Sequence, residues 1–123
     1  MVRKLTILVV FICLAVPCSL ALSQALPQPT LACNVGPVSK TYGQTQWLLY
    51  SCNDTSTLIA VSAPGNPASP FYFSFSLEGG ASYHVRGEGT GSKAASDAAY
   101  NDLQALSASA VRDLIEQTKL VGK

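Results

Sequence analysis

The sequence predicts an α+β fold: a four-stranded antiparallel β-meander with two C-terminal α-helices packed on one face, after a cleaved signal peptide. Three observations predict it: an apolar run opens the chain, period-two alternation recurs through its middle, and apolar residues at helical spacing fill its last third. We therefore divide the chain into a signal peptide (1–25), an extended proline-rich lead-in (26–41) and a single α+β domain (42–123).

The N-terminal segment has the layout of a secretory signal peptide. Arg3 and Lys4 precede an apolar run over residues 5–16, and small residues follow. The run is shorter than the about 20 residues that span a membrane, so we favour cleavage over an uncleaved anchor. The mature chain should begin at Gln24 or Leu26, and we favour Leu26. We expect an exported protein, periplasmic or extracellular, with no stable membrane insertion after cleavage.

The charge of the mature chain argues against one class of partner. From Leu26 onward six basic residues face seven acidic ones, which leaves a net charge of about minus one. The basic residues are scattered, whereas binding to nucleic acid needs several clustered cations. We therefore expect a protein or envelope component as partner and no nucleic acid. No residue set has the spacing of a metal or cofactor site, so we predict neither.

Two cysteines, Cys33 and Cys52, remain after cleavage, and we expect them to form a structural disulfide in an oxidising compartment. In the chain-entropy model, closing a loop of about 20 residues contributes about 3 kcal/mol. A redox or metal pair is the alternative. Such sites need close Cys-x-x-Cys spacing or further Cys and His ligands, and the chain has one His.

The first hairpin is expected from strands at about residues 46–52 and 57–62, joined by the turn-forming residues 53–56. That loop gives the cross-strand pairs Tyr50 with Ile59 and Leu48 with Val61. Both faces of this hairpin are apolar, as expected of strands covered on two sides. For Trp47 we favour burial in the core over a place on a recognition surface. Residues 53–55 also form a glycosylation sequon, but a plain turn explains them better.

The second hairpin has the clearest pattern, with strands at about residues 70–77 and 82–87 after a connection at 63–70 that holds three prolines. A three-residue loop sets Phe75 opposite Val85, whereas a two-residue turn would pair apolar with polar residues, so the pattern selects the odd loop. The solvent face then pairs Tyr72 with Glu88, Ser74 with Arg86, and Ser76 with His84.

Two helices are expected at about residues 93–106 and 108–120, with Ser92 and Ser107 as N-caps. The segment before the first helix, residues 87–93 (GEGTGSK), is rich in glycine. Its spacing is not that of a phosphate-binding loop, so we favour a flexible strand-to-helix joint over an anion site.

The solvent face of the second hairpin holds the candidate binding residues Tyr72, Ser74, Ser76, His84 and Arg86. Tyr and Arg concentrate binding energy at interfaces, so we predict a non-catalytic binding module that uses this face or the 63–70 loop. The alternative is a small hydrolase in which His84 activates Ser76. Both residues lie mid-strand, without the turn that exposes a catalytic serine, so we favour a plain polar face.

A short resemblance suggests a further alternative. Tyr50-Ser51-Cys52, followed by Leu58 and Val61, is similar to the opening strand of small periplasmic inhibitors of lysozyme. The resemblance implies a compact antiparallel barrel whose loop enters the cleft of an envelope hydrolase. In that family the cysteine pairs with a partner nearer the C-terminus, whereas the partner here is upstream and the last third is expected to be helical. We therefore do not assign the chain to that family.

Overall fold

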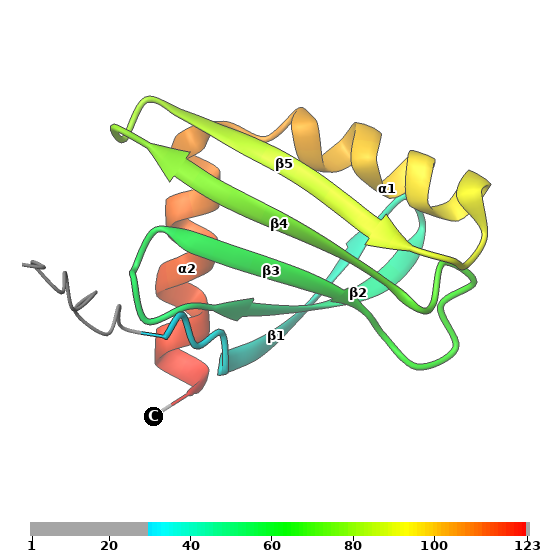
Figure 1. Ribbon diagram of the computed structural model, residues 1–123, viewed down its shortest axis with the longest axis horizontal. Coiled ribbons are helices and arrows are strands. Elements are labelled where there is room, and N and C mark those ends of the chain that lie inside the picture. The colour runs from blue at the N-terminus through cyan, green and yellow to red at the C-terminus, as the bar shows by residue number, and fades with distance from the viewer. Residues whose placement is uncertain (1–29, 123) are drawn as a thin grey trace, which may run out of the picture.

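The computed structural model describes residues 30–122, so the expected signal peptide (1–25) lies outside the described part of the chain. These residues form a five-stranded antiparallel sheet in the order β1-β2-β3-β4-β5, with two helices packed against one face (Figure 1). We call the helix-covered face the inner face and the opposite one the outer face. The elements are β1 (Val35–Tyr42), β2 (Thr45–Ser51), β3 (Thr57–Ser62), β4 (Phe71–Glu78), β5 (Ser82–Gly89), α1 (Lys93–Gln104) and α2 (Ala108–Val121).

The α+β class is confirmed, but the sheet has one strand more than predicted. All of β1 except Tyr42 lies in the segment 26–41, which the sequence predicted to be an extended lead-in, and the strand pairs with β2 along its length. Pro37 made this segment read as irregular chain in the sequence, because a proline has no N–H to donate to the hydrogen bonds of a sheet. The register shifts between Val35 and Val38, so this proline occupies an irregularity in an edge strand, where it is tolerated. The four-stranded prediction was therefore wrong.

The registers of the two predicted hairpins are confirmed. In the first, Tyr50 lies opposite Ile59 and Leu48 opposite Val61. In the second, residues 79–81 form the three-residue loop, and Phe75 lies opposite Val85. Alternation fixes the register of the second hairpin, because a slip of one residue would move every apolar side chain to the other face. The register of the first hairpin follows from its four-residue loop.

The core fills the space between the inner face and the helices. Its largest side chains are aromatic, and Trp47 is fully buried as predicted, with Nε1 donating to Thr45 Oγ1 at 2.9 Å. Phe73 packs on Trp47 at a ring-centroid distance of 5.0 Å. The core cluster comprises Trp47, Leu49, Leu58, Ala60, Ala68, Phe73, Phe75, Ala99, Leu103, Val111, Leu114 and Ile115.

The helices begin where their caps predict. Ser92 Oγ accepts from the Ala95 amide at 3.3 Å, and Ser107 Oγ accepts from the Ala110 amide at 3.0 Å. The alanines of α1 allow close approach at the β1–β2 turn: a Cβ on Gly43 would lie 2.4 Å from the Ala99 backbone nitrogen. Glycine is therefore the residue that fits there.

The outer face of the first hairpin is not covered, contrary to the prediction that β2 and β3 are covered on two sides. Both helices contact the inner face, and the ribbon shows no described element over the other (Figure 1). Leu48, Tyr50 and Ile59 are half-buried, and Val61 is exposed. The prediction failed because alternation shows that a face is apolar but not what lies against it.

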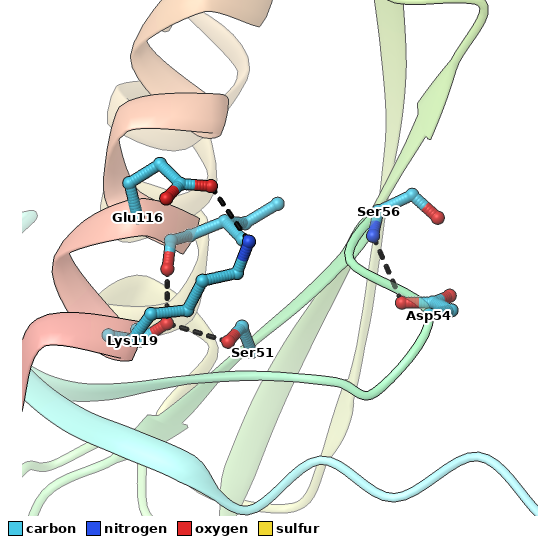
Figure 2. A network of polar contacts seen from close by, with 7 residues as sticks. Ser51, Asp54, Ser56, Glu116 and Lys119 are labelled. Carbon is cyan, nitrogen blue, oxygen red and sulfur yellow. Dashed lines mark hydrogen bonds and ion pairs between the residues drawn. The ribbon is translucent and has the colours of Figure 1, made fainter. Parts of the chain in front are cut away.

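A disulfide and polar contacts tie the left end of the sheet in Figure 1, where β2 turns into β3. Cys33 and Cys52 form the expected disulfide. In the β2–β3 turn, Asp54 Oδ1 accepts from the Ser56 amide at 3.1 Å. Nearby, the buried hydroxyls of Ser51 and Thr118 lie 2.6 Å apart, which joins β2 to α2 (Figure 2).

Candidate functional site

Apolar side chains of β2, β3 and β4 lie next to one another on the outer face, and we call this group the outer row. It consists of Leu48, Tyr50, Ile59, Val61 and Tyr72. Val61 of β3 lies between Leu48 of β2 and Tyr72 of β4, and Tyr50 lies opposite Ile59 on the same face. Val61 and Tyr72 are 37% and 41% exposed, so the row is open at its β4 end. Antiparallel sheets normally present polar residues on an uncovered face. An apolar row there indicates a contact surface.

The five candidate binding residues lie together on the outer face: Tyr72 belongs to the outer row, and the other four lie beside it. Tyr72, Ser74 and Ser76 follow one another along the outer face of β4, with Arg86 opposite Ser74 and His84 opposite Ser76 on β5. All but Ser74 are exposed. The outer face therefore combines an apolar row with a band of hydroxyl, imidazole and guanidinium groups.

Ser76, His84 and Glu78 form a polar group where β4 ends, with Ser76 opposite His84. Glu78 Oε1 lies 3.1 Å from His84 Nε2, and the two side chains are 57% and 69% exposed. Glu78 lies two residues beyond Ser76 on β4, yet its carboxylate comes within hydrogen-bonding distance of the His84 ring. A carboxylate that orients an imidazole is one part of a nucleophilic triad. At these exposures the site is open to water, unlike the enclosed sites where electrostatic catalysis is strongest.

At the opposite end of β4, the outer face is hollowed into a groove of about 530 Å³. Its walls are Val61, Pro70, Phe71 and Tyr72, and Glu88 and Thr90 contribute polar groups. The Tyr72 hydroxyl donates to Glu88 Oε2 at 3.0 Å. This hydrogen bond, and then the negative charge of Glu88, raise the pKa of the Tyr72 phenol above 10.0. We call this the Tyr72 groove.

Close backbone packing fixes the side of the Tyr72 groove that Pro70, Gly89 and Thr90 form. The Thr90 amide donates to the Pro70 carbonyl oxygen at 3.0 Å. A Cβ on Gly89 would lie 2.2 Å from that same oxygen, and one on Gly91 would lie 2.0 Å from the Ala68 carbonyl oxygen. The glycines of the segment 87–93 therefore permit close approach to the 63–70 loop, which explains why there are more of them than a simple joint needs.

The 63–70 loop, which the sequence suggested as a second binding element, is folded back onto the domain. Asn66 is buried, its Nδ2 donates to the Gln46 carbonyl oxygen at 2.7 Å, and its Oδ1 accepts from the Ala68 amide at 2.9 Å. The loop therefore forms a wall of the groove through Pro70.

Sequence reasoning missed the Tyr72 groove as a unit. It placed Tyr72 opposite Glu88, but it did not link that pair to Val61 or Pro70, which come from β3 and a loop. The apolar outer face of β3 was a signal, because Val61 lies next to Tyr72 on that face.

Comparisons with protein-family models, curated protein sequences and solved structures found no significant match. Within residues 30–122, no cluster of three or more His, Cys, Asp or Glu side chains could hold a metal ion. No helix in the same range is long and apolar enough to cross a bilayer. The function is therefore argued from the outer face itself.

Proposed function

We propose that this protein is a small exported, non-catalytic domain that binds another protein or an envelope component through the outer face of its sheet. The observation that carries the proposal is the outer row, in which Val61 and Tyr72 are exposed on a face that no described element covers. Contiguous exposed apolar side chains rimmed by polar residues mark interaction sites. Tyr72 and Arg86 supply the residue types that anchor interfaces.

Two features support export. The N-terminal sequence has the pattern of a secretory leader, and Cys33 is joined to Cys52. Disulfides persist in oxidising compartments and stabilise small domains. A rigid sheet held at one end by a disulfide is a suitable scaffold for a binding face.

Binding through the face is favoured over pairing along the β1 edge of the sheet. On the edge strand β1, Pro37 and the register shift before Val38 interrupt the ladder, and Lys40 adds a charge. Prolines, irregularities and lysines are the devices that stop edge strands from pairing with other chains. A partner therefore docks more readily on the side chains of the outer face.

The test compares the domain with two lysine variants in capture from an envelope extract of the source organism. Val61→Lys places a charge in the outer row. Val121→Lys is the matched control, because Val121 is also exposed but lies at the end of α2. We expect the unchanged domain and Val121→Lys to capture the same component, and Val61→Lys to lose it.

Equal capture by all three proteins would contradict the use of the outer face, and the absence of any specific component would contradict the binding function. If the captured component is a lysozyme-like hydrolase, inhibition of its activity by the domain would identify an inhibitor. Circular dichroism and disulfide content confirm that each variant is folded.

A second candidate function, a small hydrolase, is favoured by one observation: Glu78 reaches His84, which lies opposite Ser76. In that mechanism His84 would take the proton of the Ser76 hydroxyl as it attacks an ester or amide carbonyl, and Glu78 would orient the ring. His84→Ala should then abolish turnover of activated esters or peptides while the fold is kept. If the domain without any substitution shows no such turnover, the hydrolase function is ruled out.

A further inference from the structure

The Tyr72 groove differs from the rest of the outer face in its charge. Glu88 is the only ionisable carboxylate among its lining residues, and no Lys, Arg or His lines it. Glu88 Oε2 accepts from the Tyr72 hydroxyl, whereas Oε1 makes no hydrogen bond or ion pair within residues 30–122. An apolar groove with one available carboxylate oxygen is complementary to an apolar group with a positive charge beside it.

The size and walls of the groove fit a large side chain. Its volume of about 530 Å³ lies within the range of about 300–1,000 Å³ typical of ligand sites. Val61 and Pro70 offer aliphatic surface, and Tyr72 offers an aromatic ring. Tyr72 lies between Val61 and Glu88 in the register of the sheet. A cation paired with the Glu88 carboxylate would therefore also lie near the Tyr72 ring, and aromatic rings attract cations through their π face.

We infer that the Tyr72 groove receives, from a protein partner, a large apolar side chain adjacent to a lysine or arginine. The apolar side chain packs against Val61 and Pro70, and the cation pairs with Glu88 beside Tyr72. This inference rests on the proposed function, since it names the chemistry by which a partner engages the outer face. It assigns the groove as the anchor point and the rest of the outer row as the surrounding contact.

The experiment titrates the isotope-labelled domain with three blocked tetrapeptides by NMR: Gly-Phe-Lys-Gly, Gly-Phe-Gln-Gly and Gly-Phe-Glu-Gly. The lysine peptide should shift the amide signals of Tyr72, Gly89 and Thr90 with a millimolar dissociation constant. An exposed ion pair contributes at most about 1 kcal/mol, so the glutamine peptide should bind about two- to fivefold more weakly. The glutamate peptide should bind more weakly again.

Two variants assign the charge selection to one carboxylate. Glu88→Gln should abolish the difference between the lysine and glutamine peptides. Glu78→Gln is the matched control, because Glu78 lies on the same face at the other end of β4 and contacts His84. It should keep the difference. Equal affinity for all three peptides, or the same loss in both variants, would overturn the inference.

The remaining outcomes separate this inference from the proposed function. If no peptide binds but capture from the extract still depends on Val61, the inference fails and the proposed function stands. If neither is observed, both fail. If the domain forms a dimer by analytical ultracentrifugation and Val61→Lys returns it to a monomer, the occupant is a second copy of the chain, and the inference is also overturned.

Discussion

Leu48 and Leu49 are neighbours in β2, yet they lie on opposite faces of the sheet and have different surroundings. Leu49 is fully buried beneath the helices, whereas Leu48 is half-buried on a face without a described cover. The same contrast separates Phe73 from Tyr72 in β4. The same residue types are thus buried in the core on one face of the sheet and partly exposed on the other.

The difference teaches that burial, and not hydrophobicity, decides how much an apolar side chain contributes to the stability of this fold. On the inner face an apolar side chain is held by neighbours on all sides, so its removal leaves a cavity. On the outer face it is held by sheet neighbours alone, so its removal mainly changes the surface. Stability and binding should therefore respond to different substitutions.

The largest expected effect is on the inner face. Leu49→Ala should lower the free energy of unfolding by about 4 kcal/mol, because it removes a buried side chain and leaves a cavity. Leu48→Ala should lower it by about 1 kcal/mol, because that side chain is already partly in water. Urea denaturation with an unchanged slope measures both. Equal losses would remove the distinction between the faces.

A smaller effect is expected at the glycines of two turns with similar backbone angles. Gly43 has a φ of 56° and Gly79 a φ of 59°. Alanine in this left-handed region costs about 1 kcal/mol, which is the whole effect expected for Gly79→Ala, since a Cβ there meets nothing within 4 Å. Gly43→Ala adds a clash with α1 and should cost about 3 kcal/mol in urea denaturation. Similar losses at the two sites would show that α1 yields readily.

A third effect sharpens the comparison within the inner face, where Ser51 and Thr118 form a buried polar contact. Thr118 Oγ1 also lies 2.5 Å from the Ile115 carbonyl oxygen, so the contact is satisfied if Thr118 donates to Ile115 and Ser51 to Thr118. Thr118→Val should cost about 2 kcal/mol, because the Ser51 hydroxyl loses its partner. Adding Ser51→Ala should reduce that loss. A double variant less stable than Thr118→Val would disprove the pairing.

The smallest effect on stability is expected on the outer face, at Tyr72. Its raised pKa means that the folded state holds the phenolic proton more tightly than the unfolded state. The associated stability is present below pH 10.0 and is lost as the pH rises through the folded pKa. Glu88→Gln should lower the Tyr72 pKa, measured from the ring carbon signals by NMR, whereas Glu78→Gln should leave it unchanged. At neutral pH neither change should shift the urea midpoint appreciably.

The second hairpin and the two helices could be predicted from the sequence because their signals are local. Alternation around Phe75 fixes the register and the loop length, and Ser92 and Ser107 mark the helix starts through hydrogen bonds within one turn. β1 could not be predicted, because a segment that contains Pro37 is typical of irregular chain. Only its pairing with the neighbouring strand β2 makes it a strand.

The candidate site could be predicted only in part. Each of the five candidate binding residues lies on the outer face where alternation placed it, but the Tyr72 groove depends on the 63–70 loop folding back through Asn66. That contact joins residues far apart in the sequence. The openness of the outer row likewise depends on where the helices pack, which no pattern within one strand encodes.

The first and last residues that the structure describes lie at the same end of the sheet. Asn53 Nδ2, at the β2–β3 turn, donates a hydrogen bond to the Thr30 carbonyl oxygen. A Cβ on Gly122 would lie 3.1 Å from the Gly36 nitrogen. The Tyr72 groove is lined by residues from the opposite end of β3 and the start of β4. That end of the sheet is on the right in Figure 1. An immobilising tag attached at Thr30 or Gly122 would thus hold the molecule at one end of the sheet and present the opposite end to solution.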